Sequence, residues 1–115
     1  HTPATNRWFG RRELELMKSS AYLFNVGRGK TVDEEALIDA LRNGSIAGAG
    51  LDVFAEEPLP ESSPLWRMEN VILTAHYSGL TPEYDDRLWN IFIENLKRYQ
   101  RGEELMNRVD PELGY

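Results

Sequence analysis

Residues 21–31 read AYLFNVGRGKT, an apolar run that ends in an arginine between two glycines. The run is typical of a strand buried on both faces of a parallel sheet. The glycines suggest a phosphate-binding loop, but the spacing is wrong for the two common kinds. A GxGxxG fingerprint starting at Gly27 has Val32 in place of its third glycine, and a GxxxxGK[ST] loop has Phe24 in place of its first. The stretch therefore predicts a buried strand and a turn without a phosphate loop.

Two segments near this strand carry apolar residues at helical spacing. The first covers residues 10–18, before the strand. The second starts at Glu34 and stops at Asn43-Gly44. Either a capping box of Thr31 and Glu34 or the side chain of Asp33 can cap its first turn. Both segments are predicted helices, and the second has the stronger pattern.

A third helix is predicted near the end of the sequence. Thr81 is a candidate N-cap, Pro82 suits the first helical position, and Gly102 suits the stop. The residues expected on its buried face are Leu88, Ile91, Phe92, Leu96 and Tyr99. Residues 103–115 carry weak signals and are predicted to form mostly loop.

Two further apolar runs, residues 46–53 and 71–74, predict strands. The small side chains of the first run suit a strand that its neighbours approach closely. Residues 56–64 between them hold three prolines and predict a loop. Strands that alternate with helices indicate β–α–β units, so we expect an α/β fold with a parallel sheet and flanking helices.

Composition restricts the kinds of partner. The chain has 115 residues, 41% of them hydrophobic, which is enough for one globular unit. A net charge of −6 without a basic stripe argues against nucleic-acid binding. The absence of cysteine excludes disulfides and thiolate chemistry, and no apolar run approaches the roughly 20 residues of a membrane span. We expect a soluble, cytoplasmic protein without a membrane partner, and no metal site is predicted.

Polar residues that could carry chemistry follow each predicted strand. Arg28 follows the first, Asp52 and then Glu57 follow the second, and His76 follows the third. Ligands of parallel α/β sheets bind outside the carboxyl ends of the strands, so these residues should converge. Each one alone has an ordinary explanation as a surface charge, a turn carboxylate or a histidine bonded to backbone. Together they favour a site, because arginine grips carboxylates and a histidine beside a carboxylate transfers protons.

Three blocks of sequence resemble signatures of the D-isomer-specific 2-hydroxyacid dehydrogenases. They read NVGRG at residues 25–29, GAGLDVF and EEP at 48–54 and 56–58, and LTAHYSG at 73–79. Their order and separations match the family from residue 1 to about 102. The resemblance implies a Rossmann-like fold, in which residues 1–102 form the C-terminal half of the NAD(P)-binding domain. It also implies that residues 103–115 are a tail returning toward a substrate domain.

The resemblance assigns roles to individual residues. Arg28 is expected to bind the substrate carboxylate, His76 to be the acid/base, and Glu57 to assist His76. Asp52 corresponds to the residue that bonds the nicotinamide carboxamide. The residues implied for the NAD or NADP site are Thr2, Thr5, Val26, Gly27, Arg28, Asp52, His76, Ser78 and Gly79.

The implied function is hydride transfer between a nicotinamide cofactor and a small D-2-hydroxy acid or 2-oxo acid, as in glyoxylate and hydroxypyruvate reductases. The full-length protein is expected to be a homodimer. Ala75 departs from the family, which usually has proline before the histidine. The sequence also lacks a GxGxxG turn and a substrate domain, so we expect it to be a piece of a longer chain that is inactive alone.

Two other functions compete with the dehydrogenase. A non-catalytic, NAD(H)-sensing relative of the corepressor kind could keep the same fold and the same three residues, so it remains an alternative. A response-regulator-like module fits the length of the chain. It fails because no acidic cluster follows the first predicted strand.

Overall fold

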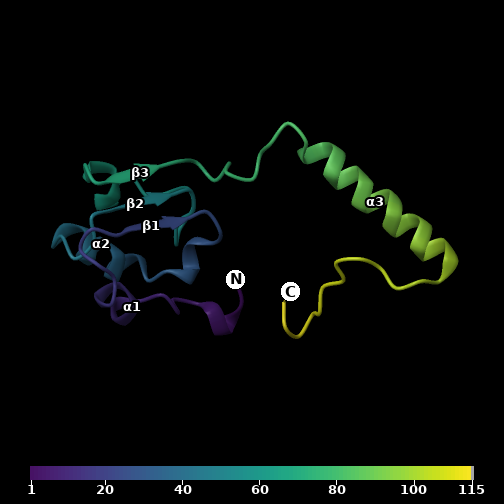
Figure 1. Ribbon diagram of the computed structural model, residues 1–115, viewed down its shortest axis with the longest axis horizontal. Coiled ribbons are helices and arrows are strands. Elements are labelled where there is room, and N and C mark those ends of the chain that lie inside the picture. Colours follow the sequence, from purple (N-terminus) through teal and green to yellow (C-terminus); the bar gives the residue numbers. More distant parts are fainter. Residues whose placement is uncertain (115) are drawn as a thin grey trace. The chain divides into compact units, whose positions relative to one another are not determined.

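The computed structural model describes residues 1–114 and separates into two units, His1–Ser78 and the residues from Gly79 onward (Figure 1). The first unit contains a parallel sheet. Its strands, in spatial order, are β1 (Tyr22–Asn25), β2 (Gly48–Leu51) and β3 (Val71–Leu73). The predicted parallel sheet is confirmed. The strands are shorter than the apolar runs, because the hydrogen-bonded ladder extends only where neighbouring strands overlap.

Helix α2 (Glu34–Arg42) connects β1 to β2, and the short helix α1 (Arg11–Glu15) packs against it. Three single turns of 3-10 helix complete the unit, η1 (Pro3–Thr5), η2 (Gly29–Thr31) and η3 (Pro64–Arg67). Helix α1 ends at Glu15, three residues before the end predicted from the sequence at Lys18. The amides of Leu16 and Met17 donate to carbonyls three residues back, which tightens the chain into a turn.

The cap of α2 is the Asp33 side chain, which accepts a hydrogen bond of 3.1 Å from the Ala36 amide. Of the two predicted caps, the structure therefore selects Asp33 over the Thr31–Glu34 box. The Thr31 hydroxyl donates instead to the Arg28 carbonyl at 2.6 Å. Glu34 is thereby left free to bond elsewhere, and its carboxylate is used in the site described below.

The core of the first unit lies on one face of the sheet. Residues buried there come from α1, α2, β2 and the segment around η3, and include Leu14, Leu37, Leu41, Leu51 and Leu65. Successive side chains of a strand point to opposite faces of the sheet, so every second residue of these strands lies on the face away from the core. These include Tyr22, Phe24 and Ile72, which are 61%, 71% and 70% exposed. The prediction that the first strand is buried on both faces is therefore wrong, because the helices of this unit pack on one face only.

The small residues of β2 have the predicted packing role. A Cβ atom at Gly50 would lie 2.6 Å from Cδ1 of Phe24, whose ring lies across the neighbouring strand. Such a distance is far below ordinary van der Waals contact. Gly50 therefore allows the Phe24 ring to lie close over β2.

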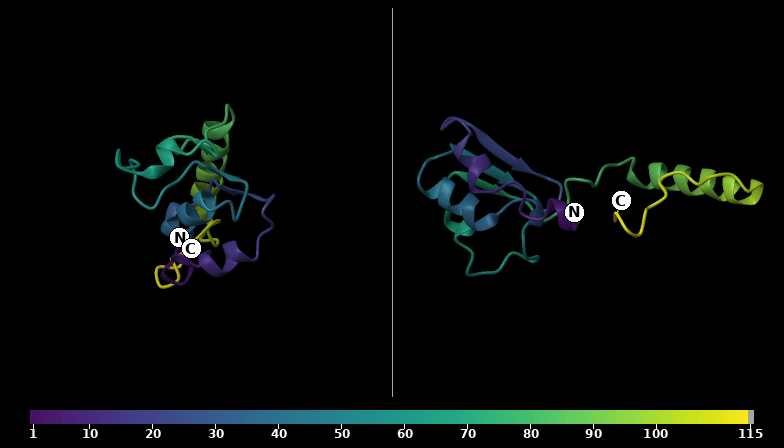
Figure 2. Two further views of the ribbon diagram at one scale, coloured as in Figure 1. Left: turned by 90° about the vertical axis from the view of Figure 1, so that its left-hand side faces the viewer. Right: turned by 90° about the horizontal axis from the view of Figure 1, so that it is seen from below.

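The second unit contains one long helix, α3 (Tyr84–Arg101), which runs unbroken in Figure 2. It stops as predicted at Gly102, whose φ of 68° is left-handed. The predicted start at Thr81 and Pro82 is wrong. The Tyr84 amide donates to the Thr81 carbonyl in a preceding turn, and Glu83 takes the N-cap position.

The predicted buried face of α3 is also wrong. Leu88, Phe92 and Tyr99 are 53%, 55% and 75% exposed, and no residue of the helix is buried. An amphipathic pattern marks a face that can be buried, but burial needs a second layer, which the described part of this unit does not supply. Among residues 1–114, no helix is both long and apolar enough to cross a membrane.

Candidate active site

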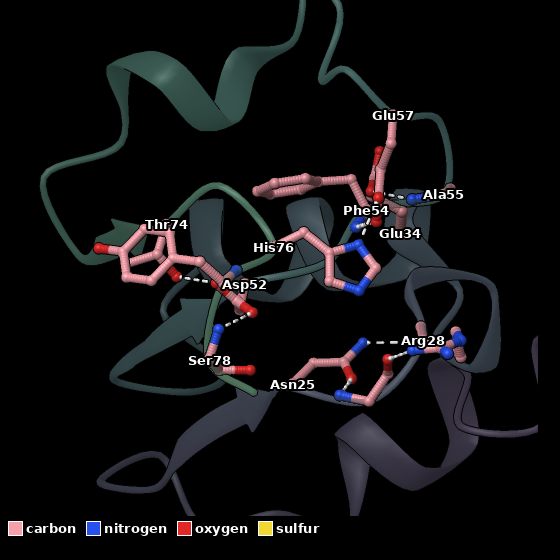
Figure 3. Close-up of polar contacts among 12 residues, drawn as sticks. Asn25, Arg28, Glu34, Asp52, Phe54, Ala55, Glu57, Thr74, His76 and Ser78 are labelled. Atoms are coloured by element: carbon pink, nitrogen blue, oxygen red, sulfur yellow. Dashed lines mark hydrogen bonds and ion pairs between the residues drawn. The ribbon is translucent and has the colours of Figure 1, made fainter. Parts of the chain in front are cut away.

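The loop after β1 is shaped by the side chain of Asn25. Its Nδ2 donates to the Arg28 carbonyl at 3.2 Å, and its Oδ1 accepts from the Gly27 amide at 3.2 Å (Figure 3). Asn25 is 9% exposed, so these bonds satisfy a buried amide. The Arg28 guanidinium is exposed, and its Nη1 donates to the Gly27 carbonyl at 2.9 Å. The loop thus presents a cation at the carboxyl end of β1.

The turn after β2 lies directly against this loop. A Cβ atom at Gly29 would lie 1.9 Å from the carbonyl oxygen of Phe54, so only glycine fits there without movement of the backbone. The Phe54 amide donates to Oε1 of Glu57 at 2.9 Å, and the Ala55 amide donates to Oε2 of Glu34 at 3.0 Å. Two carboxylates therefore hold two successive amides of one turn.

His76 follows β3 and faces the same turn. Its Nδ1 lies 2.7 Å from Oε2 of Glu57, and Figure 3 shows the other ring nitrogen directed toward the loop of Asn25 and Arg28. The backbone of His76 has a φ of 55°, an uncommon left-handed conformation for a non-glycine residue. It is held by the next two amides, Tyr77 and Ser78, which donate to the Asp52 carboxylate at 3.1 and 2.9 Å.

Asp52 anchors this loop from inside the protein. It is 2% exposed, and besides the two amides it accepts a hydrogen bond from the Thr74 hydroxyl. That hydroxyl first, and then the hydrogen bonds of Ser78 and Tyr77, hold the pKa of Asp52 well below its usual range. The carboxylate therefore stays ionised and fixes the backbone on both sides of His76.

Glu57 is also kept ionised. The Phe54 amide is the main cause of its lowered pKa, followed by the hydrogen bond to His76, and Arg28 contributes through its charge. An ionised Glu57 can orient the imidazole and stabilise its protonated form. The pair has the geometry of an acid/base histidine supported by a carboxylate.

Two pockets meet at this pair. Arg28, Glu57 and His76 line a pocket of about 280 Å³, together with Gly29 and other residues. A larger, mainly apolar pocket of about 700 Å³ adjoins the other side of the pair. Its lining includes Phe54, Leu59, Trp66 and Tyr77. Within residues 1–114, no cluster of three or more metal-ligating side chains is close enough to hold a metal ion.

The structure thus brings Arg28, Glu57 and His76 to one pocket. Val26 and Gly27 lie in the Arg28 loop, and Asp52 and Ser78 are joined in the loop of His76. Thr2 and Thr5 are joined by a hydrogen bond, in which the Thr2 amide donates to the Thr5 hydroxyl at 2.8 Å. Thr2 directly follows His1, which is one of the residues that line this pocket. Gly79 belongs to the second unit.

Three contributors to the site were not predicted as site residues. Asn25 and Thr74 are polar residues at the ends of apolar strands, and that position could have singled them out. Glu34 was predicted only as part of a helix cap. No local signal identifies its role, because its partner Ala55 lies 21 positions further along the chain.

Residues 1–78 match the family model described as the NAD binding domain of the D-isomer specific 2-hydroxyacid dehydrogenases. The chain is 43% identical over 116 residues to a glyoxylate reductase of Korarchaeum cryptofilum, covering 98% of this chain and 35% of the relative. It is 44% identical over 112 residues to glyoxylate/hydroxypyruvate reductase B of Pectobacterium carotovorum, covering 97% and 35%. The chain therefore spans about a third of the length of these relatives.

Solved structures show the same likeness. A D-isomer specific 2-hydroxyacid dehydrogenase of Xanthobacter autotrophicus, in complex with NADPH and MES, matches with a TM-score of 0.91 and 43% identity, covering 100% of this chain and 47% of that one. An NADPH-dependent glyoxylate/hydroxypyruvate reductase of Sinorhizobium meliloti, in complex with NADP and sulfate, matches with a TM-score of 0.89 and 29% identity, covering 100% and 37%. With its Rossmann-like parallel sheet and its match over residues 1–78, the chain belongs to the D-isomer specific 2-hydroxyacid dehydrogenase family, within the NAD-binding domain.

Proposed function

We propose that the full-length protein is an NAD- or NADP-dependent oxidoreductase that interconverts a small 2-oxo acid and the corresponding D-2-hydroxy acid. The observation that carries the proposal is the shared pocket of Arg28, Glu57 and His76, with His76 Nδ1 2.7 Å from the Glu57 carboxylate. The names of the relatives support glyoxylate and hydroxypyruvate as candidate substrates.

Arg28 is proposed to bind the substrate carboxylate. Its guanidinium is exposed at the pocket, and a planar guanidinium can donate two parallel hydrogen bonds to a carboxylate. That grip fixes the position of the neighbouring carbonyl group. The same positive charge stabilises the negative charge that develops on the carbonyl oxygen during reduction.

His76 is proposed to move the proton. Its Nδ1 is engaged by Glu57, so Nε2 is the nitrogen available to donate a proton to the carbonyl oxygen, and to accept it in the reverse direction. A bound reduced nicotinamide supplies the hydride that the substrate C2 accepts. Glu57 keeps the imidazole oriented and favours its protonated form.

We propose that a nicotinamide ring lies against the chain's surface beside this pocket. Val26 is 63% exposed, and Gly27 has no side chain to cover the loop, so an apolar ring can approach the carboxyl end of β1. We propose that this loop borders the ring and that Asp52 bonds its carboxamide. Asp52 is 2% exposed and already accepts from Thr74, Tyr77 and Ser78, so that bond requires its carboxylate to become accessible when the cofactor binds. The remaining proposed contacts are those of Thr2, Thr5, Ser78 and Gly79.

The proposal extends to the domain boundaries and the assembly. Residues 1–102 are assigned to the C-terminal half of the NAD(P)-binding domain and residues 103–115 to a tail toward a substrate domain. A homodimer is proposed for the full-length protein. The domain boundaries, but not the homodimer, draw support from the relatives, about three times longer than the chain, and from the stop of α3 at Gly102.

The test is an absorbance assay of nicotinamide oxidation by the full-length protein with glyoxylate, hydroxypyruvate and pyruvate. We expect turnover with at least one acid. Arg28→Lys should raise the KM for that acid about tenfold or more, because one charge-assisted hydrogen bond of the pair is lost. Its affinity for the cofactor should be unchanged. Arg12→Lys, at an exposed position of α1, is the matched control and should behave as wild type.

The outcomes separate the alternatives. If no 2-oxo acid is turned over, the dehydrogenase function is refuted. Tight cofactor binding in that case would favour the NAD(H)-sensing alternative. If Arg28→Lys weakens only cofactor binding, the carboxylate role of Arg28 is wrong.

A further inference from the structure

The turn that carries Glu57 is tied to the first turn of helix α2. The Ala55 amide donates to Oε2 of Glu34 at 3.0 Å, and the preceding amide, Phe54, donates to Glu57 at 2.9 Å (Figure 3). We propose that Glu34 is a positioning residue that holds Glu57, and through it His76, in the geometry needed for proton transfer. This inference rests on the proposed function.

Glu34 is well placed to act as a fixed anchor. It is the first residue of α2, directly after the N-cap Asp33, and α2 buries Leu37 and Leu41 in the core. A carboxylate in the first turn is also favoured by the helix dipole. Glu34 is half-buried and its bond to Ala55 spans 21 positions of sequence. The packed helix therefore supplies a rigid point from which the turn is held.

The other side of the turn is held by close packing. The backbone of Phe54 lies so near Gly29 that even a Cβ atom at Gly29 would overlap its carbonyl. The turn therefore cannot move toward the Arg28 loop. Without the Glu34 bond it can move away from that loop, and Ala55 and Phe54 must move together because they are adjacent. The Phe54–Glu57 bond and then the Glu57–His76 contact at 2.7 Å are expected to loosen.

The arrangement predicts a change in pH dependence. The Phe54 amide is the main cause of the lowered pKa of Glu57, and the charged groups that face Glu57 are His76 and Arg28. A weaker Phe54 bond raises the pKa of Glu57 toward its ordinary value. A carboxylate with a lowered pKa is ionised above that pKa, and its support of His76 is lost as pH falls through that pKa and the carboxylate becomes protonated. When a protein that lacks the Glu34 carboxylate is acidified, its activity should therefore fall at a higher pH than that of wild type.

The experiment compares three variants of the full-length enzyme, Glu34→Ala, Glu34→Gln and Glu35→Ala. Glu34→Ala removes the acceptor and should lower kcat for 2-oxo acid reduction about 10- to 100-fold, with the acid limb of the pH profile moved to higher pH. Glu34→Gln keeps an oxygen acceptor and should restore most of kcat. Glu35 lies in the same turn of α2 with its side chain 90% exposed, so Glu35→Ala should behave as wild type.

A second readout does not depend on turnover. The ring nitrogens of His76 are followed by ¹⁵N NMR of histidine-labelled protein, with the signals assigned by His76→Asn. We expect Glu34→Ala, but not Glu34→Gln, to change the Nδ1 resonance. An unchanged resonance with unchanged kcat would overturn the positioning role, and so would equal impairment by alanine and glutamine. If wild type turns over no acid, the proposed function fails, and the NMR result alone then supports or overturns the role of Glu34 in holding the pair.

Discussion

Replacement of Gly29 by alanine tests how tightly the two loops of the site are coupled. The new Cβ would lie 1.9 Å from the carbonyl oxygen of Phe54 and 2.0 Å from its carbonyl carbon. Ordinary contact begins at 3.4 Å, so the Phe54 backbone must retreat by about 1.5 Å (3.4 − 1.9). The Phe54–Glu57 bond measures 2.9 Å and is lost beyond about 3.5 Å. The required movement is therefore larger than the bond tolerates.

Two opposing effects set the expected stability of Gly29→Ala. Alanine restricts the unfolded chain and thereby stabilises the protein by roughly 0.4–1 kcal/mol. Overpacking costs about 1–3 kcal/mol, and the upper part of that range applies because the obstacle at Gly29 is backbone rather than a flexible side chain. We expect a net loss of about 1–2.5 kcal/mol. Loss of the Phe54 hydrogen bond that holds Glu57 should also lower kcat about 100-fold, because a misplaced Glu57 no longer orients His76.

The assays are urea unfolding of the full-length protein and the turnover assay described above. Gly10→Ala is the matched control, because a Cβ atom there meets nothing closer than 3.6 Å and Gly10 lies outside the site. Gly10 is the N-cap of α1, where alanine is less favourable than glycine by up to about 1 kcal/mol, so this variant should lose no more than that and should keep wild-type kcat. Wild-type kcat and stability in Gly29→Ala would refute the reasoning. Reduced stability with wild-type kcat would refute the coupling of Gly29 to the Glu57–His76 pair.

The remaining predictions concern the two carboxylates beside His76. Glu57→Gln should lower kcat/KM for glyoxylate reduction, because an amide cannot supply the charge that supports His76 in proton transfer; an unchanged kcat/KM would contradict this role. Asp52→Asn should lower the urea midpoint at pH 7, because an amide group replaces an acceptor that faces the Tyr77 and Ser78 amides. The pKa of Asp52 is lower in the folded protein than in the unfolded chain, where it is about 3.9. Its contribution to the free energy of unfolding is therefore complete above about pH 3.9 and is lost as pH falls from there through the folded pKa. Urea midpoints of wild type and Asp52→Asn should therefore converge on acidification, and parallel curves would show that Asp52 does not contribute in this way.

The site divides the roles of its residues between surface and interior. Arg28 is exposed at the pocket, and about half of the His76 side chain is accessible to ligands. The groups that fix them are more buried, with Asp52 at 2% and Asn25 at 9% exposure. Buried polar groups of this kind must have their hydrogen bonds satisfied, and here the partners are the loop amides and carbonyls themselves. The loops are thereby fixed by hydrogen bonds between buried side chains and the loop backbone.

Much of the site was predictable because its signals are local. The apolar runs marked the strands, and the rule that ligands bind at their carboxyl ends selected Arg28, Asp52, Glu57 and His76, from which the family resemblance singled out Arg28, Glu57 and His76. Glu34 and Asn25 were not predicted as site residues. Glu34 acts through Ala55, 21 positions away, and no spacing pattern encodes such a contact. Asn25 was visible as a polar end to an apolar strand, but its bonds to Gly27 and Arg28 depend on the loop conformation.

By itself the sequence determined the order of strands and helices, the helix α2, the stop at Gly102 and the identity of the three pocket residues. These follow from periodicity, glycine conformation and side-chain chemistry, which are properties of short segments. Only the tertiary structure decided which faces are buried. It left Phe24 on an exposed face of β1 and left α3 without a buried side, because burial depends on the layer packed against a segment. It also decided which carboxylate holds which amide, because those bonds join residues that only folding brings together.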